Sequence, residues 1–151
     1  MTWLEDFRVG DRWRHCRGTT VGEVEGQLLT KLVLNTAQAH FNDHAMAGSP
    51  LGEGRLVFGL VTGSIVVGLA TQDTAEHAVA EVGLTGVRFT APVHLGDTLY
   101  ALTEVLSVDA TTRPDAGLVR FRHWGINQRD EVVFEGERSV LVEKRHPGEP
   151  A

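Results

Sequence analysis

The segment Gly59–Ala70 constrains the fold of this chain more than any other stretch of its sequence. Apolar side chains occur all round its helical projection, and the residues between them are glycine, alanine, serine or threonine. A helix without a polar face must be buried on most of its sides. A glycine inside a helix costs about 1 kcal/mol relative to alanine, so Gly59, Gly63 and Gly68 indicate that other parts of the chain approach the helix backbone closely. We therefore expect a core helix packed tightly on a sheet.

The sheet is predicted from four runs of residues that follow this helix. Turn signals rich in Gly, Pro and Asp separate the runs. In one run Val119 and Phe121 alternate with arginines, which is typical of a strand with one buried face. Asp11–Arg17 predicts a fifth, earlier strand, and the short connections favour antiparallel pairing of consecutive strands. The four runs are Ala78–Phe89, Thr98–Val108, Leu118–Gln128 and Val132–Val142.

The expected architecture is a single α+β domain, with five or so antiparallel strands wrapped round one buried helix. The length of 151 residues fits one domain, because a chain of this size can bury roughly 70% of the surface that its unfolded form exposes. A doubly wound nucleotide fold is not expected, since the sequence contains neither the glycine-rich dinucleotide fingerprint nor the Walker A phosphate loop. We expect the domain to cover residues 1–146 and residues 147–151 to form a flexible tail.

A first helix is predicted ahead of the core helix. Thr20 and Glu23 have the spacing of a capping box, in which a hydroxyl and a carboxylate satisfy unpaired backbone N–H groups, so we expect this helix to begin at Thr20. Polar residues such as Gln27 face away from its apolar side. The pattern decays at Leu34, and a loop is expected from there through Gly54. The apolar side consists of Val24, Leu28, Leu29 and Leu32.

The charge balance argues against a nucleic-acid-binding protein. The sequence has 14 Lys and Arg residues against 20 Asp and Glu residues, a formal net charge of −6. Dedicated nucleic-acid binders normally show a basic balance or a basic patch. The strongest basic cluster is interpreted as one face of a strand. It comprises Arg12, Arg14, His15 and Arg17.

Cysteine content and hydropathy indicate a cytoplasmic protein. Cys16 is the only cysteine, so no disulfide can form within the chain and no oxidising compartment is needed. The acidic start of the sequence does not have the pattern of a secretory signal. The longest apolar run, Leu56–Ala70, falls short of the about 20 residues that cross a bilayer. We therefore expect no membrane association.

The stretch from residue 34 to residue 44 gathers more hydrogen-bonding side chains than any other. His40 and His44 are four residues apart, which on a helix places both imidazoles on one face. A zinc site of the H-E-x-x-H type would need a glutamate after the first histidine and a third ligand, and neither is evident, so we predict no metal. Asp43 and His44 are interpreted as a solvated helix cap, and the remaining histidines as packing or surface residues.

A set of motifs runs through nearly the whole chain. They are Phe7-x-Val9-Gly10-Asp11, the loop from Asn35 to Asn42, the Gly59 helix, Val87 to Val93, Gly96 to Leu99, Gly117 to Arg120, Asn127-Gln128 and Glu137-Arg138. In this order they together resemble the MaoC-like enoyl-CoA hydratases, and most of all the branch with mesaconyl-CoA, itaconyl-CoA and methylmalyl-CoA hydratases. The resemblance implies a hot-dog fold that dimerises edge to edge, with the active site at or near the dimer interface.

The resemblance also implies an active-site loop at residues 35–40. In the (R)-specific hydratases of the family this loop reads Asp-x-Asn-Pro-x-His, and here Asn35 and His40 occupy the two catalytic positions. An amide cannot accept a proton at neutral pH, so Asn35 is predicted to orient the water. Imidazole, with an ordinary pKa near 6.5, suits both the uptake and the return of a proton. His40 is therefore predicted to act as general base and general acid.

In the family, a backbone N–H at the start of the central helix polarises the thioester carbonyl. Gly59 occupies that position, and an unpaired N–H at a helix N-terminus suits a developing oxyanion. Phe58 and Asn42 are predicted to contact the substrate. The chain departs from the family at Phe58, where many relatives have His or Asn, and at Val67, where the (R)-specific hydratases have serine. These departures indicate either a changed pocket or reduced hydratase activity.

The expected reaction is reversible hydration of an enoyl-CoA to a 3-hydroxyacyl-CoA, with a branched or dicarboxylic acyl group of the mesaconyl type. The coenzyme A thioester is the substrate, no cofactor is expected, and the expected assembly is a homodimer or higher homo-oligomer. Arg55, Arg88 and Arg120 can meet acidic groups of coenzyme A, but strand arginines are more often surface residues and none is assigned. Two alternatives stay open: an acyl-CoA thioesterase, which usually uses a pocket carboxylate, and a catalytically silent acyl-CoA-binding protein.

Overall fold

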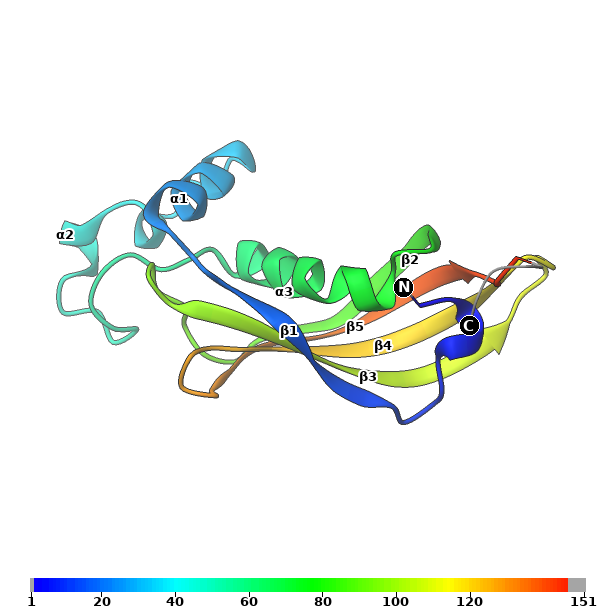
Figure 1. Ribbon diagram of the computed structural model, residues 1–151. Coiled ribbons are helices and arrows are strands. Elements are labelled where there is room, and N and C mark those ends of the chain that lie inside the picture. Colours follow the sequence, from blue (N-terminus) through cyan, green and yellow to red (C-terminus); the bar gives the residue numbers. More distant parts are fainter. Residues whose placement is uncertain (1, 147–151) are drawn as a thin grey trace.

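The computed structural model describes residues 2–146, so the predicted flexible tail at residues 147–151 lies outside the described residues. Five antiparallel strands form one sheet in the order β1-β3-β4-β5-β2, and helix α3 (Gly59–Thr74) lies along one face of it (Figure 1). This confirms the predicted α+β architecture. The strands are β1 (Arg12–Thr20), β2 (Ala78–Phe89), β3 (Thr98–Ala110), β4 (Ala116–Ile126) and β5 (Val132–Glu143).

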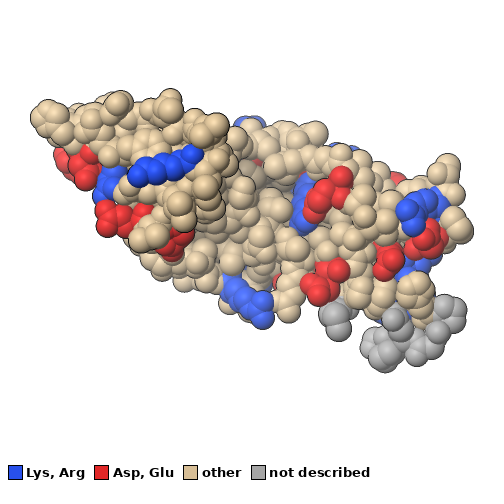
Figure 2. All heavy atoms as spheres, turned by 90° about the horizontal axis from the view of Figure 1, so that it is seen from above, with Lys and Arg blue, Asp and Glu red and all other residues tan. Residues whose placement is uncertain are grey.

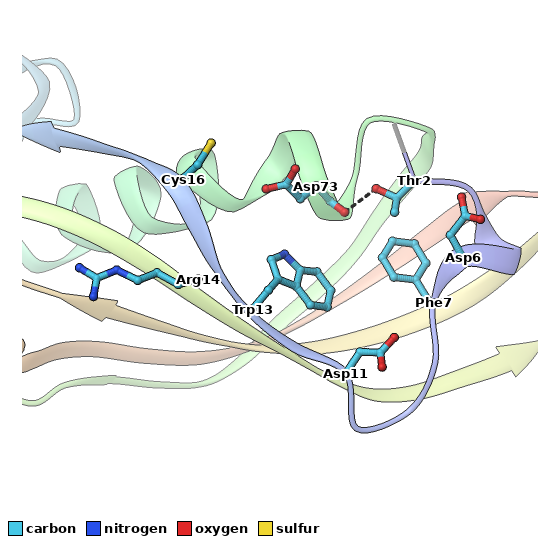
Figure 3. Close-up of a pocket in the computed structure, with 8 residues that line it drawn as sticks. All are labelled: Thr2, Asp6, Phe7, Asp11, Trp13, Arg14, Cys16 and Asp73. Carbon is cyan, nitrogen blue, oxygen red and sulfur yellow. Dashed lines mark hydrogen bonds between the residues drawn. The ribbon is translucent and has the colours of Figure 1, made fainter. Parts of the chain in front are cut away.

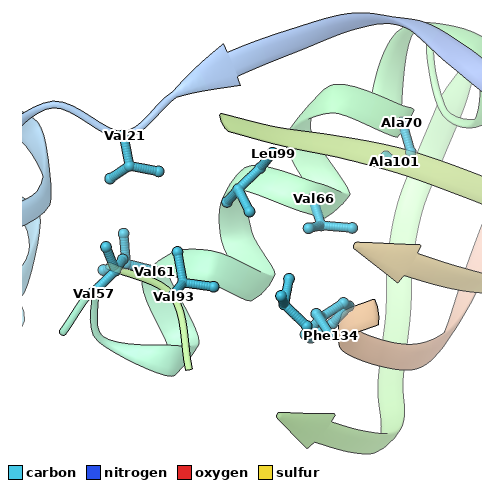
Figure 4. Packing of buried hydrophobic residues seen from close by; sticks show 10 residues of the cluster. Val21, Val57, Val61, Val66, Ala70, Val93, Leu99, Ala101 and Phe134 are labelled. Atoms are coloured by element: carbon cyan, nitrogen blue, oxygen red, sulfur yellow. The ribbon is translucent and has the colours of Figure 1, made fainter. Parts of the chain in front are cut away.

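Helix α3 packs closely on the sheet at Gly63, as the sequence predicts, whereas Gly68 is exposed and faces open space, which corrects the prediction there. A Cβ added to Gly63 would lie 2.8 Å from the ring of Phe134 on β5. A Cβ added to Gly125 on β4 would lie 2.4 Å from the side chain of Val66 on α3. Both positions must therefore lack a side chain for helix and sheet to meet. Figure 4 shows the buried cluster around this contact, which includes Val61, Val66, Ala70, Leu99, Ala101 and Phe134.

One stripe of α3 is not covered by the sheet. Leu60 is 56% exposed, and Ser64 and Gly68, which follow at intervals of four residues, are also exposed. The neighbouring edge strand β2 exposes apolar side chains as well, with Val82 at 59% and Leu84 at 47%. In this single chain the apolar helix is thus buried only on the sides that meet the sheet and the loops.

The alternation predicted for β4 is confirmed. Val119 and Phe121 are 0% exposed and belong to a second core cluster, in which the Phe7 ring lies edge-on to the Phe121 ring with centroids 5.1 Å apart. Arg120 and Arg122 occupy the alternate positions, on the opposite face of the sheet. There both arginines pair with the carboxylate of Glu137 on β5.

The antiparallel pairing favoured for consecutive strands holds for β3, β4 and β5 but not for β2 and β3. Strands β3, β4 and β5 pair in sequence order, but β2 pairs with β5 at one edge of the sheet, and β3 pairs with β1 towards the other. The chain therefore has to travel from the edge strand β2 across the sheet to β3, which lies next to the opposite edge strand β1. Residues 90–97, the crossing segment, make this connection, and it is long enough to do so without pairing the two strands directly.

The crossing segment runs past the amino end of α3. The Val57 N–H donates to the Val93 carbonyl oxygen at 2.8 Å, and Leu56 forms an antiparallel bridge with His94. At its far end the carboxylate of Asp97 accepts hydrogen bonds from the His94 N–H, at 2.9 Å, and from the Gln128 amide, at 2.6 Å. These contacts fix the segment beside the start of the core helix.

Helix α1 (Glu23–Leu32) begins later than the predicted capping box. Thr20 is the last residue of β1, where its hydroxyl lies 2.7 Å from the hydroxyl of Thr98 on β3. Gly22 is the N-cap instead, and its N–H donates to the carboxylate of Glu25 at 3.0 Å. Thr20, which the local sequence predicted as the helix cap, is therefore part of the sheet and pairs across the strands. The apolar side of α1 is exposed at Val24, Leu28, Leu29 and Leu32.

The basic cluster on β1 does not form a single face, which corrects the prediction. Arg12 and Arg14 are exposed, whereas His15 is only 3% exposed and points into the protein. The register between β1 and β3 shifts between Arg14 and Gly18, so the strand bulges where His15 turns inward. On the face seen in Figure 2, basic and acidic side chains are interspersed. Among the helices of residues 2–146, none is both long and apolar enough to cross a membrane.

Candidate active site

The polar loop folds into two short helices and not one. The 3-10 helix η2 (Gln38–His40) ends at His40, and α2 (Asp43–Met46) contains His44. His40 and His44 therefore do not share a helix, because the chain leaves the helical conformation at Phe41 and Asn42 between them. His44 is exposed. Within the described part of the chain, no group of three or more His, Cys, Asp or Glu side chains is placed to hold a metal ion.

Among residues 2–146, the ring of His40 is hydrogen-bonded through one nitrogen only. Its Nδ1 lies 2.9 Å from the Leu56 carbonyl oxygen. A carbonyl can only accept, so Nδ1 carries the proton and, in the neutral ring, Nε2 keeps a free lone pair. The Leu56 N–H donates in turn to the Ala39 carbonyl oxygen at 2.9 Å, which ties the loop to residue 56 in both directions. The Phe58 ring, with its centroid 5.5 Å from that of His40, packs beside the imidazole.

His40 lines a chamber of about 220 Å³ at the amino end of α3. Ten residues from the loop, helix α3, the crossing segment and strands β2 and β5 surround it, and apart from the imidazole their only polar side chain is the hydroxyl of Thr62. The chamber is thus an apolar space with one candidate base. Its lining residues are His40, Leu56, Val57, Gly59, Thr62, Phe89, Ala91, Pro92, Val93 and Val133.

Gly59 is the first residue of α3 and part of the chamber wall. Phe58 is the N-cap, and its side chain makes no capping hydrogen bond. The first N–H groups of a helix have no intrahelical acceptor and carry the positive end of its dipole. In α3 the first N–H groups with a backbone acceptor are those of Val61 and Thr62, which donate to the Phe58 carbonyl oxygen at 2.9 and 3.0 Å. The chamber therefore adjoins a helix end suited to negative charge.

Phe89, the last residue of β2, closes the chamber over Gly59. A Cβ added to Gly59 would lie 3.0 Å from the Phe89 ring, so the ring rests directly on the helix backbone. Phe89 is 48% exposed. One wall of the chamber is thus a partly exposed aromatic ring at the free edge of the sheet.

Asn35 and Asn42 do not line the chamber. The Asn35 side-chain oxygen accepts the Ala37 N–H at 2.9 Å. The Asn42 side-chain oxygen caps α2 by accepting the Ala45 N–H at 3.1 Å, and its amide donates to Gln38 at 2.7 Å. The water-orienting role of Asn35 and the substrate contact of Asn42 therefore stay predictions.

The chamber wall contains His40 and Gly59, which the sequence analysis predicted as site residues, and further residues that it did not predict. Thr62, Phe89 and Val133 are new members of the wall. A hydroxyl inside an otherwise apolar helix was the available signal for Thr62. For Phe89 and Val133 the sequence held no signal, because their positions depend on the pairing of β2 with β5.

The three arginines considered for coenzyme A are engaged with carboxylates. Arg55 donates to Asp43 at 2.8 Å and also to Glu23. Arg88 and Arg120 each donate to a glutamate on β5 at 2.8 Å. These pairs order the surface of the sheet and the loop, and they leave the assignment of a coenzyme A contact open.

A larger hollow of about 470 Å³ lies between β1 and the carboxyl end of α3 (Figure 3). Asp73 in its wall accepts a hydrogen bond from Nδ1 of the buried His15 at 2.6 Å, and His15 Nε2 lies 2.6 Å from the Thr103 hydroxyl. The Thr103 hydroxyl also lies 2.8 Å from Nδ1 of His123. Both nitrogens of His15 are thus occupied, and none of the predicted site residues lies here, so the smaller chamber is the candidate active site.

Burial is the main cause that lowers the pKa of His123, to about 3, and the positive charges of Arg138 and His15 add to it. His123 is 0% exposed, and its Nε2 has no hydrogen-bond partner among the described residues. The ring is therefore neutral at physiological pH. It forms the inner end of a hydrogen-bonded row that runs through Thr103 and His15 to Asp73.

An antiparallel sheet wrapped round one apolar helix, with an imidazole at the amino end of that helix, defines a hot-dog domain of the MaoC-like hydratase class. The family model for mesaconyl-CoA hydratase matches residues 5–144. The chain belongs to this family.

Named relatives agree with this assignment. The chain is 33% identical to beta-methylmalyl-CoA dehydratase of Chloroflexus aurantiacus over 99% of its own length, and 37% identical to mesaconyl-CoA hydratase of Haloarcula hispanica over 87%. It spans only 42% and 36% of those two relatives. The crystal structure of a putative MaoC domain protein dehydratase from Chloroflexus aurantiacus superposes with a TM-score of 0.86 at 34% identity, covering 99% of this chain and 42% of that one.

Proposed function

We propose that this domain hydrates an enoyl-CoA to a 3-hydroxyacyl-CoA and catalyses the reverse dehydration. The observation that carries the proposal is the single anchored nitrogen of His40: Nδ1–H donates to Leu56, and Nε2 is left free beside the amino end of α3. The names of the relatives, which are hydratases and dehydratases of CoA thioesters, support the same reaction class.

The proposed reaction uses only groups of the chamber. The oxygen of a water attacks C3 of the conjugated thioester as His40 Nε2 takes one of its protons. The π-electron pair moves towards the thioester carbonyl, where the Gly59 N–H stabilises the enolate oxygen. His40 then returns the proton to C2, and one water has been added across the double bond. Asn35 would take part as a further contact to the water.

The chamber suits the acyl end of such a substrate. Its volume of about 220 Å³ lies below the roughly 300–1,000 Å³ of pockets that hold drug-sized ligands, so it accommodates a short acyl group and not the whole thioester. None of its ten lining residues is a carboxylate, which disfavours a thioesterase. None is Lys or Arg either, so a dicarboxylic acyl group of the mesaconyl type would need a cation from outside this wall.

We further propose that a second copy of the chain docks on the edge strand β2. The exposed stripe of α3 and the apolar residues Val82 and Leu84 lie at this edge, and the unpaired backbone groups of β2 can continue the sheet. Phe89 belongs both to β2 and to the chamber wall, so the partner would complete the site. We place the activity in the cytoplasm, since the exposed free thiol of Cys16 suits a reducing compartment.

The reaction is tested with a panel of thioesters. Crotonyl-CoA, a methyl-branched enoyl-CoA and mesaconyl-CoA are followed by loss of enoyl absorbance, and a thiol reagent monitors release of free coenzyme A. We expect absorbance loss without thiol release for at least one substrate. Thiol release alone would identify a thioesterase, and binding without either signal would identify a silent acyl-CoA-binding domain.

The assembly is tested by light scattering of the purified chain and of a charged edge variant. We expect a dimer for the wild type and a monomer with impaired turnover for Val82→Glu. Val9→Glu places the same charge at a 66% exposed position in a turn outside the edge, and it should remain dimeric. A wild-type monomer with full activity would contradict the proposed edge contact.

A further inference from the structure

Thr62 stands out as a buried hydroxyl inside the apolar chamber. It lies on the first turns of α3, three residues after Gly59, and is only 2% exposed. It lines the chamber together with His40 and Gly59. Three polar groups therefore converge on this small space: a free imidazole nitrogen, a helix N-terminal N–H and a hydroxyl.

The Thr62 hydroxyl is free, unlike the other helical hydroxyls near it. Ser64, Thr71 and Thr74 on the same helix each donate to the carbonyl oxygen four residues earlier, at 2.7–2.8 Å. The Thr62 hydroxyl makes no such bond to Phe58, whose carbonyl oxygen already accepts two backbone N–H groups, and it has no other partner within residues 2–146. It is therefore available to a ligand in the chamber.

The proposed hydration needs a group of this kind. An attacking water gives one proton to His40, and its second O–H must be held so that a lone pair of the oxygen points at C3. Asn35, which the sequence assigned to this task, has its side-chain oxygen occupied by the Ala37 N–H and does not line the chamber. A threonine hydroxyl can accept the second O–H, because its oxygen has two lone pairs.

We propose that the Thr62 hydroxyl binds the attacking water and, after the reaction, the 3-hydroxyl group of the product. This inference rests on the proposed hydratase function and names the second water contact of that site. The hydroxyl transfers no proton to the substrate. It orients the water that His40 deprotonates, and in the dehydration direction it orients the departing hydroxyl group.

The test compares Thr62→Val, which keeps the shape and removes the hydroxyl, with Thr62→Ser, which keeps the hydroxyl. Turnover is measured on the thioester that the wild type hydrates best. We expect Thr62→Val to lower kcat about 10- to 100-fold with KM changed less than about threefold, and Thr62→Ser to stay within about threefold of the wild type. A Thr62→Val enzyme with wild-type kcat, or equal losses in both variants, would overturn the proposal.

A binding measurement separates this inference from the proposed function. Calorimetry compares 3-hydroxybutyryl-CoA with butyryl-CoA, which lacks the hydroxyl group. We expect the wild type and Thr62→Ser to prefer the hydroxylated thioester by about tenfold, one hydrogen bond's worth, and Thr62→Val to lose the preference. Without turnover of any thioester, a retained preference would still support the Thr62 contact while the hydratase proposal fails. Equal affinities of the wild type for the two thioesters would contradict the proposed Thr62 contact itself.

Discussion

Two histidine environments at opposite ends of α3 differ in how many ring nitrogens the protein occupies. At the carboxyl end, His15 has both nitrogens bonded, to Asp73 and to Thr103, and the adjacent His123 is enclosed in the core. At the amino end, His40 has one nitrogen bonded to Leu56, and the other is left free in an apolar chamber.

The difference teaches why the larger hollow is not the better candidate for catalysis. A row of hydrogen bonds runs from His123 through Thr103 and His15 to the Asp73 carboxylate. Such a row fixes the positions of β1, β3, β4 and α3 relative to one another and leaves no lone pair on His15 for a substrate. A ring nitrogen left without a partner beside an apolar pocket is a better guide to a catalytic base than the size of a hollow or its number of polar groups.

The largest expected effect is a loss of hydration activity on substitution of His40 at the amino end of α3. His40→Ala should reduce hydration by about 10²- to 10⁴-fold, the usual contribution of a general acid–base group, and should leave the fold intact because the ring is only partly buried. Steady-state kinetics and circular dichroism measure the two properties. The matched control is His44→Ala, at an exposed position of α2, which should keep wild-type turnover. Near-wild-type activity of His40→Ala would refute the assignment of the base.

The next effect should appear in stability alone. Thr103→Val deprives His15 Nε2 and His123 Nδ1 of their shared partner, and each buried nitrogen left unpaired costs about 1–3 kcal/mol. Urea unfolding measures the loss, and turnover of the folded protein should be unchanged. Thr103→Ser keeps the hydroxyl and should recover most of the stability. If Thr103→Val abolished activity without loss of stability, the functional contrast between the two ends would be wrong.

A smaller effect depends on pH. The pKa of His123 falls from 6.5 in the unfolded chain to about 3 in the folded one, so between these values the unfolded state binds a proton that the folded state excludes. Stability should therefore decrease as pH is lowered through this window, by up to about 1.4 kcal/mol per pH unit from this group. His123→Gln removes the titrating ring, and its stability should depend less steeply on pH between 6.5 and 3. Parallel curves for the two proteins would contradict the neutral buried ring.

The smallest expected effect compares two glycines one turn apart on α3. Gly63→Ala pushes a methyl group against the buried Phe134 ring and should cost about 1–3 kcal/mol of stability by overpacking. Gly59→Ala pushes against Phe89, which is half exposed and can shift, so its cost should appear as a roughly tenfold lower kcat, because the methyl group crowds the helix N–H. Unfolding and turnover measurements on both variants test this contrast. Equal turnover of the two variants would argue against the oxyanion role of Gly59.

Local sequence was sufficient for the elements that depend on short-range pattern. Strand β2 has the predicted bounds. The alternating burial around Phe121 and the apolar composition of α3 were predicted from side-chain periodicity. The family resemblance also selected His40 and Gly59, and the structure places both in the chamber wall. The start of α1 was missed because Thr20 pairs with Thr98 across the sheet, a contact invisible in local sequence.

Only the tertiary structure decided what surrounds those two residues. The pairing of β2 with β5 places Phe89 and Val133 in the chamber wall and sends the crossing segment past the start of α3. The occupied oxygen of Asn35 and the free hydroxyl of Thr62 are likewise outcomes of folding, because hydrogen-bond partners depend on which chain segments meet in space. Sequence alone determined the type of domain and its candidate base, while long-range strand pairing determined the shape of the space in which that base can act.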